Sequence, residues 1–351
     1  MKIETQLPLG NLDPGLRTAS GGLDLARVGE EARLAEALGY DGIVTEETKD
    51  DPFIILALAA QTTERIGLAT GVAIAFPRAP AVTALAAWTL ARLSKGSFTL
   101  GLGSQVKGHI ERRYGMAWTP PGPWMRDYVG ALRAIWACWQ DGGTKLDYQS
   151  AHYKLSLMVP LFAPPPIEHP DIPVQLAAVN PFMCQVAGEV ADGIRAHPVC
   201  TPAYIRDVML PAARKGAEKT GRDFSRFEIA AMPLIATAPD RAGLEARVRD
   251  VRARIAFYAS TPTYLIAFES QGYGEVARIL QGYSRAQRWE EMPGFISDEM
   301  LDHYAVIGTH DEIAAKLNQR FAGVASHLDF AIPIAGDADK AVLSDLLKSL
   351  R

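Results

Sequence analysis

The sequence predicts a single α/β domain over residues 1–351, with the (β/α)8 architecture of a TIM barrel. The composition is 48% hydrophobic and 22% charged, which is typical of a globular protein. Short apolar segments alternate with amphipathic helical patterns along most of the chain, as in a parallel sheet covered by helices. No G-x-G-x-x-G segment opens the first helix, so an open dinucleotide-binding sheet lacks its signature. Eight units without a central linker close more readily into a barrel, because an open sheet must reverse its strand order.

The first half of the chain supplies four strand–helix units. The strands are short apolar runs that end near glycine or polar residues, and we expect them at 2–8, 42–45, 66–71 and 97–102. The helices carry apolar residues three and four positions apart, and we expect them at 25–38, 52–62, 79–93 and 124–140. A helical pattern also begins at residue 110 and is interrupted at 120–123, where three of the four residues are proline.

The second half supplies four further strands and two segments that break the alternation. We expect strands at 174–178, 193–196, 227–236 and 327–333, and helices at 181–190, 202–220, 241–258, 311–321 and 338–350. The segments 145–171 and 259–301 are interpreted as insertions. The first is rich in proline and holds one candidate strand at 153–158, and the second is rich in aromatic residues and glycine.

Charge and cysteine content exclude several classes of function. The net charge is −4 and no basic stripe is present, so we do not expect nucleic acid as a partner. Cys138, Cys184 and Cys200 are far apart and lack C-x-x-C spacing, which argues against a disulfide framework or a structural zinc site. The apolar stretches are too short or too interrupted to span a bilayer, so we expect a cytoplasmic protein without membrane association.

The motifs of metal-dependent and serine-dependent hydrolysis are also missing. The sequence contains no H-E-x-x-H, no H-x-x-x-H and no G-x-S-x-G. We therefore expect no metal, and we expect an organic cofactor to supply the reactivity.

In a barrel enzyme the active site lies at the carboxyl ends of the strands, and this rule selects the candidate residues. They are Glu46, Glu47 and Thr48 after the second strand, residues 73–78 after the third, Gly103, Ser104, Gln105 and His109 after the fourth, Val179 and Asn180 after the fifth, and His197 after the sixth.

The polar candidates also have structural interpretations. Neighbouring residues of a strand point to opposite faces, so at most one of Glu46 and Glu47 faces the barrel mouth. The pair is otherwise a solvated acidic turn before the next helix. His109 and His197 are either functional residues or packed and surface residues.

Two backbone features are open to the same two interpretations. The Gly101-Leu102-Gly103-Ser104 segment lets a flat or anionic ligand approach the backbone, or it is an ordinary tight turn. Asn180 precedes a proline at the first position of a helix, where backbone N–H groups hold a phosphate in many proteins. Asn180 could equally cap the helix without any ligand.

Several segments resemble one known family, the bacterial-luciferase-like flavin and deazaflavin oxidoreductases. The segments are GYDGIVTEET at 39–48, TERIGLATGV at 63–72, FPRAP at 76–80, ARLSKGSFTLGLG at 91–103, IPVQLAAVNP at 172–181, AGEVADG at 187–193 and VIGT at 306–309. The segment QVKGHIERRYGM at 105–116 is similar to a branch described as F420-dependent oxidoreductases of mycobacterial type.

The resemblance implies a barrel that binds a tricyclic ring at its mouth, with the cofactor phosphate near Ala178, Val179 and Asn180. It also implies a non-proline cis peptide between Gly71 and Val72, in a bulge beneath the ring. We assign nine residues to cofactor binding. They are Gly71, Val72, Gly103, Ser104, Ala177, Ala178, Val179, Asn180 and His197.

The sequence departs from the sugar- and alcohol-oxidising members of that family at two places. Those relatives carry an acidic residue followed by histidine after the second strand, where this chain has Glu46-Glu47-Thr48. They present a glutamate after the fourth strand, where this chain has Ser104-Gln105. We therefore assign catalysis to Glu46 or Glu47 together with Gln105 and His109, and we do not transfer the alcohol dehydrogenase mechanism.

Three functions follow from these expectations. The first is hydride transfer between coenzyme F420 and a small organic substrate, the second is an FMN-dependent monooxygenase, and the third is a non-catalytic coenzyme-binding protein. We also expect a homodimer. On the helices after the second and third strands, Phe53, Leu56 and Trp88 either form the dimer face or occupy ordinary barrel-packing positions. Six aromatic residues either line the substrate pocket or pack in the core. They are Trp136, Trp139, Tyr258, Tyr264, Phe268 and Tyr273.

Overall fold

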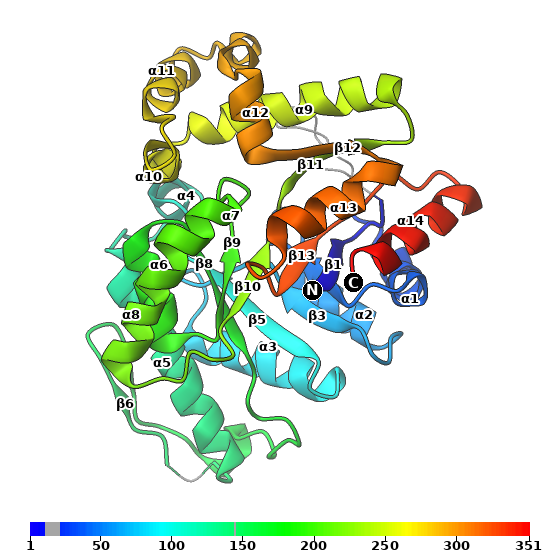
Figure 1. Ribbon diagram of the computed structural model, residues 1–351. Coiled ribbons are helices and arrows are strands. Elements are labelled where there is room, and N and C mark those ends of the chain that lie inside the picture. The colour runs from blue at the N-terminus through cyan, green and yellow to red at the C-terminus, as the bar shows by residue number, and fades with distance from the viewer. Residues whose placement is uncertain (11–21, 144) are drawn as a thin grey trace.

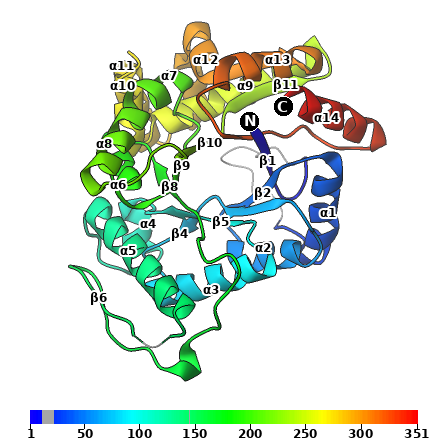
Figure 2. The ribbon, with the colours of Figure 1, turned by 60° about the horizontal axis from the view of Figure 1, so that its bottom comes forward.

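Eight parallel strands form a closed ring in the computed structural model, which describes residues 1–10, 22–143 and 145–351. The strands are β1 (Lys2–Gln6), β2 (Gly42–Thr45), β3 (Gly67–Thr70), β5 (Phe98–Gly103), β8 (Val174–Ala178), β9 (Gly193–Ala196), β10 (Glu228–Ala231) and β13 (His327–Asp329). They pair in chain order, β1 pairs with β13, and the pairing of β3 with β5 completes the ring. The predicted TIM barrel is confirmed, and Figure 2 shows the helices arranged around these strands.

The helices that cover the barrel begin and end at the residues that local chemistry favours. They are η1 (Leu25–Arg27), α1 (Val28–Leu38), α2 (Pro52–Ala60), α3 (Pro80–Leu93), α4 (Lys107–Arg112), α5 (Pro121–Gln140), α6 (Pro181–Val190), α7 (Pro202–Tyr204), η3 (Ile205–Met209), α8 (Leu210–Thr220), α13 (His310–Phe321) and α14 (Asp337–Ser349). Several have proline in their first turn, where no backbone donor is lost. Asp51 caps α2 by accepting the Phe53 N–H, and Gly39 ends α1 in the left-handed region.

The apolar core lies between the strands and these helices. Ile43, Leu100 and Leu176 on the strands are fully buried. Leu56 and Trp88 on the covering helices are also fully buried, and Phe53 is 8% exposed. The three residues expected at a dimer face therefore pack within the chain, as the alternative interpretation held. No helix in the described ranges is long and apolar enough to cross a membrane.

The first insertion contains a small hairpin. Strand β6 (Tyr148–Gln149) pairs antiparallel with β7 (Lys154–Leu155), and η2 (Pro160–Phe162) follows. The candidate strand at 153–158 therefore forms only over two residues. The four prolines between 160 and 166 limit further pairing, because proline donates no ladder hydrogen bond.

The second insertion corrects the sequence prediction most strongly. The expected strand at 227–236 is two strands, because β11 (Leu234–Ala238) leaves the ring after Met232-Pro233 and pairs with β12 (Ala305–Thr309), which was not predicted. Helix α9 (Arg241–Ala259) follows β11. The rest of the insertion is mostly helical, with η4 (Pro262–Tyr264), α10 (Leu265–Glu269), α11 (Gly274–Arg285), η5 (Trp289–Phe295) and α12 (Asp298–Tyr304). Figure 1 shows these elements gathered beside the barrel.

Candidate functional site

The floor of the barrel mouth is built from small residues at the ends of three neighbouring strands. The peptide bond between Gly71 and Val72 is cis, as the family resemblance implies. A Cβ atom added to Gly103 would lie 2.6 Å from Val72 Cγ2 and 3.7 Å from the Ala177 Cβ. Four of the nine predicted cofactor-binding residues therefore lie side by side, and the Val72 side chain packs against Gly103.

The bulge after β3 is held in place by Glu47. The Glu47 carboxylate accepts a hydrogen bond of 2.8 Å from the Ile74 N–H and forms an ion pair with Arg78. The other terminal nitrogen of the Arg78 guanidinium, Nη2, donates a hydrogen bond of 2.8 Å to Asp51 Oδ2. Burial lowers the pKa of the Arg78 guanidinium, but the two carboxylates outweigh burial and raise it. Ile74 and Arg78 belong to the bulge and the loop after it, so Glu47 anchors this part of the chain.

Glu46 and Glu47 point to opposite faces of the strand, as the alternation of strand residues requires. The charge of Glu46 acts on Asp329 inside the barrel. There it faces Asp329, a residue at the end of β13 that the sequence analysis did not select. The Gln6 side-chain amide donates a hydrogen bond of 3.3 Å to Asp329 Oδ2. Burial, together with the nearby charges of Glu4 and Glu46, raises the pKa of Asp329 to about 7, although Gln6 and Arg195 oppose the shift.

Beneath the mouth the barrel interior is closed by a buried ion pair. Arg195 on β9 donates hydrogen bonds of 2.9 and 3.3 Å to the two carboxylate oxygens of Glu4 on β1. Burial raises the pKa of Glu4, but Arg195 more than compensates, and the pKa is lowered. The pair leaves little room beside it, because a Cβ atom on Gly101 would lie 3.1 Å from Arg195 Cδ.

The loop after β8 is held by hydrogen bonds at its two central residues. The Tyr204 hydroxyl donates to the Val179 carbonyl at 2.9 Å. Asn180 caps α6, because its side-chain oxygen accepts the Met183 N–H at 2.9 Å. The predicted cap is therefore present, and α6 begins at Pro181, shortly after β8 ends at Ala178.

His197 forms an aromatic cluster at the end of β9. Its ring centroid lies 4.1 Å from that of Tyr264 and 4.6 Å from that of Tyr258. Burial lowers the pKa of His197 to about 3, so the imidazole is neutral at physiological pH. Of the six aromatic residues considered for the pocket, these two tyrosines lie at His197, whereas Trp136, Trp139 and Phe268 are buried core residues.

The loop after β5 contains the remaining predicted residues. Gln105 adopts a positive φ of 56°, and its side-chain oxygen accepts the Val106 N–H at 2.9 Å. The Ser104 hydroxyl donates to the Gln105 carbonyl at 3.2 Å. His109 lies on α4 with an exposed side chain. The structure therefore brings Glu46 to the interior, and it places His109 on the surface of the helix that follows β5.

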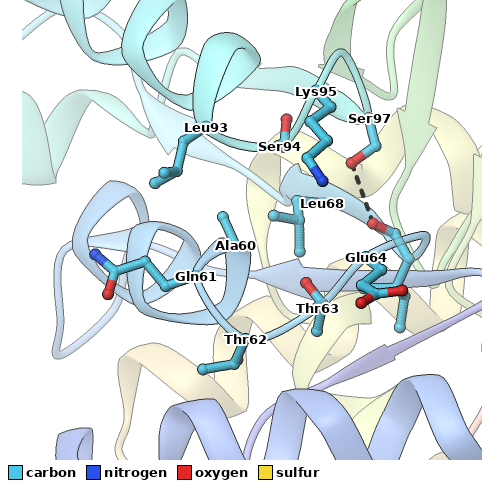
Figure 3. Close-up of a pocket in the computed structure, with 11 residues that line it drawn as sticks. Ala60, Gln61, Thr62, Thr63, Glu64, Leu68, Leu93, Ser94, Lys95 and Ser97 are labelled. Atoms are coloured by element: carbon cyan, nitrogen blue, oxygen red, sulfur yellow. Dashed lines mark hydrogen bonds between the residues drawn. The ribbon is translucent and has the colours of Figure 1, made fainter.

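A separate hollow of about 550 Å³ lies at the opposite end of the barrel. The loops before β3 and β5 line it, and Figure 3 shows Lys95, Ser97 and Glu64 on one side of it. Ser97 already donates its hydroxyl to the Ile66 carbonyl. Because barrel enzymes place their chemistry at the carboxyl ends of the strands, this hollow is not the candidate site.

Comparison with known proteins finds relatives that match most of the chain. An uncharacterised protein of Mycobacterium tuberculosis is 42% identical over 93% of this chain and 95% of its own length. A putative coenzyme F420-dependent oxidoreductase of the same species is 29% identical over 81% of this chain and 84% of its own. The structure of the F420-dependent tetrahydromethanopterin reductase of Methanopyrus kandleri matches with a TM-score of 0.74 and 19% identity, covering 98% of this chain and 97% of that one. The family model described as luciferase-like monooxygenase matches residues 9–327, and the chain belongs to this family.

Proposed function

We propose that the protein binds the deazaflavin coenzyme F420 at the barrel mouth and transfers a hydride between it and a small organic substrate. The observation that carries the proposal is the floor of small residues at the ends of β3, β5 and β8. Glycine at positions 71 and 103 leaves room for the side chains of Val44 and Val72, which pack closely against them. The floor therefore consists of small, closely packed apolar groups, on which a planar tricyclic ring can lie. The 29% identical relative with an F420-dependent name supports the same cofactor.

The chain also offers a position for the phosphate that such a cofactor carries. Helix α6 has ten residues and begins at the mouth, and the amino terminus of a helix favours an anion through its dipole and its backbone N–H groups. Asn180 holds the first turn of this helix in place. Of the other predicted residues, Ala178 ends β8 and Val179 connects it to the Asn180 cap.

The bound deazaflavin would supply the hydride donor or acceptor. The chain would hold the ring on the floor, exclude water and position the substrate above it. Tyr258, Tyr264 and His197 form one aromatic wall beside this position, and the neutral His197 adds no charge. Such a wall favours an uncharged, partly apolar substrate.

A second candidate is an FMN-dependent monooxygenase, which the description of the matching family favours. FMN also has a planar tricyclic ring and a phosphate, so the same floor and the same helix terminus would hold it. The two functions differ in the reaction with oxygen, which reduced FMN in a monooxygenase requires and a hydride transfer from F420 does not.

Fluorescence titration of the purified protein with F420 and with FMN tests the proposal. We expect F420 to bind at least ten times more tightly than FMN and to turn over with a panel of aldehydes, ketones and enones without oxygen. Tighter binding of FMN with oxygen-dependent turnover would instead establish the monooxygenase. Tight F420 binding without any redox change across the panel would indicate a coenzyme-binding protein.

A further inference from the structure

Asp329 lies at the boundary between the closed interior of the barrel and the open mouth. Its neighbour in the strand register is Glu4, which is buried and paired with Arg195. The only side-chain hydrogen bond that the structure gives Asp329 within the described residues comes from Gln6, near the mouth. Asp329 itself is half-buried, whereas Glu4 is 6% exposed. Asp329 therefore lies where the polar interior of the barrel meets the candidate cofactor site.

The charges around Asp329 favour a proton there. Glu4 faces it from β1 and Glu46 from the end of β2, and both raise its pKa. Arg195 faces it from β9, but within the described residues this guanidinium donates its two hydrogen bonds to Glu4. Tyr40, whose hydroxyl donates to the Phe330 carbonyl, lies near enough for the Asp329 charge to raise its pKa. His327 lies two residues earlier on β13, and the charges of Lys2 and Glu228 act on it. Glu228 accepts a hydrogen bond of 2.9 Å from Gln175.

The other acid–base candidates at the mouth are poorly suited to hold a proton near neutral pH. Glu47 is held by Arg78 and by the Ile74 N–H, so its carboxylate is already engaged with the bulge after β3. The pKa of His197 is lowered to about 3, so this ring stays neutral and is a weak base. His109 is exposed on α4. Among the described residues of the mouth, Asp329 with its neighbour Glu46 combines an inward position with a proton that can be exchanged near pH 7.

We propose that Asp329 is the general acid and base of the hydride transfer, with Glu46 tuning it through its charge; this proposal rests on the proposed function. In the reducing direction, a bound reduced deazaflavin would supply a hydride to the electrophilic carbon of the substrate and would itself be oxidised by two electrons. The π electrons of the substrate double bond move to its oxygen, or to the α-carbon of an enone. That atom takes the proton of the Asp329 carboxyl, and water reprotonates the carboxylate afterwards. Oxidation of an alcohol follows the same steps in reverse.

The first test uses the protein without cofactor, labelled with ¹³C at the aspartate side-chain carboxyl. We expect one aspartate signal to titrate near pH 7, to vanish in Asp329→Asn and to move to lower pH in Glu46→Gln. Asp345→Asn, an exposed residue of α14 paired with Lys348, should leave that titration unchanged. A signal for Asp329 that titrates at the ordinary value of about 4 would overturn the proposal.

The second test uses turnover with F420 and distinguishes this proposal from the proposed function. We expect Asp329→Asn to bind F420 within threefold of the wild type, to lose about 100-fold in kcat and to lose the pH dependence near 7. A wild type that does not bind F420 would contradict the proposed function. A wild type that turns over F420, with an equally fast and equally pH-dependent Asp329→Asn, would contradict only the role of Asp329. Circular dichroism of each variant checks that the fold is retained.

Discussion

Two carboxyl groups inside the same barrel, one closed from solvent and one at the mouth, differ in the charge they carry. Glu4 and Asp329 are register partners on neighbouring strands, and burial raises the pKa of both. Glu4 receives two hydrogen bonds from Arg195 and its pKa is lowered, whereas Asp329 receives one from Gln6 and its pKa is raised to about 7. The hydrogen-bond partner of a buried carboxyl group, rather than burial itself, therefore decides the direction of its pKa shift. A cationic partner keeps the group in a structural ion pair, whereas a neutral partner leaves it able to exchange a proton.

The largest effect is expected from Arg195→Met, which leaves Glu4 buried without its cation. Removing one partner of a buried ion pair typically costs 3–5 kcal/mol, and we expect about 4 kcal/mol in the free energy of unfolding by urea denaturation. The double variant Arg195→Met with Glu4→Gln should recover part of this loss. Arg206→Met, at an exposed ion pair, is the matched control and should give no measurable change. A loss below 1 kcal/mol for Arg195→Met would show that Glu4 does not depend on this partner.

Glu47 extends the comparison to a third carboxylate, which lies near the mouth but has an arginine partner. Glu47→Gln should lower the free energy of unfolding by about 2 kcal/mol, because charged hydrogen bonds to Arg78 and Ile74 are weakened. We also expect weaker F420 binding with an unchanged pH dependence of kcat, since the bulge loses its anchor while Asp329 is intact. A shifted pH profile would assign Glu47 to proton transfer instead.

The pH dependence of stability separates the two types of acid. Asp329 has its ordinary pKa of 3.8 in the unfolded chain and a value of about 7 in the folded one. Between these values the folded protein holds a proton that the unfolded chain releases, so the contribution of Asp329 to stability is lost as the pH rises through 7. Compared with Asp329→Asn, the wild type should be about 2–3 kcal/mol less stable at pH 8 than at pH 5. His197 has the opposite slope and cancels in this difference, and a flat difference would contradict the raised pKa.

The smallest effect is expected at the capped helix of the cofactor site. Asn180→Ala removes the side-chain acceptor of the Met183 N–H and should cost about 1 kcal/mol in thermal or urea unfolding. Ser297→Ala removes an equivalent cap from α12 in the second insertion and serves as the control. Both variants should lose similar stability, but only Asn180→Ala should weaken F420 binding. Equal F420 affinity in the two variants would show that the cofactor phosphate does not bind at the amino terminus of α6.

The sequence predicted the barrel because its strands and helices are short, local and strongly patterned. It did not predict β12, since the partner of Ala305 is Leu234, some seventy residues earlier, and no local pattern reports such a pairing. The helices of the second insertion were missed for a related reason: aromatic residues and glycine obscure their spacing.

The site shows the same limit. The rule of strand ends found Gly71, Gly103 and Asn180, because each lies at the end of a correctly placed strand. It passed over Asp329, because the last strand was expected to continue to residue 333 and in fact ends at Asp329. The alternation of His327, Leu328 and Asp329 was the available signal, since a polar–apolar–polar strand indicates one face turned toward a polar interior.

A crystal structure of the protein with F420 tests the central claim most directly. We expect the deazaflavin ring on the floor formed by Gly71, Val72, Gly103 and Ala177, with its phosphate beside Asn180 at the start of α6. A ring bound elsewhere, such as the hollow beside Lys95 and Glu64, or a mouth that stays empty at saturating F420, would contradict the account.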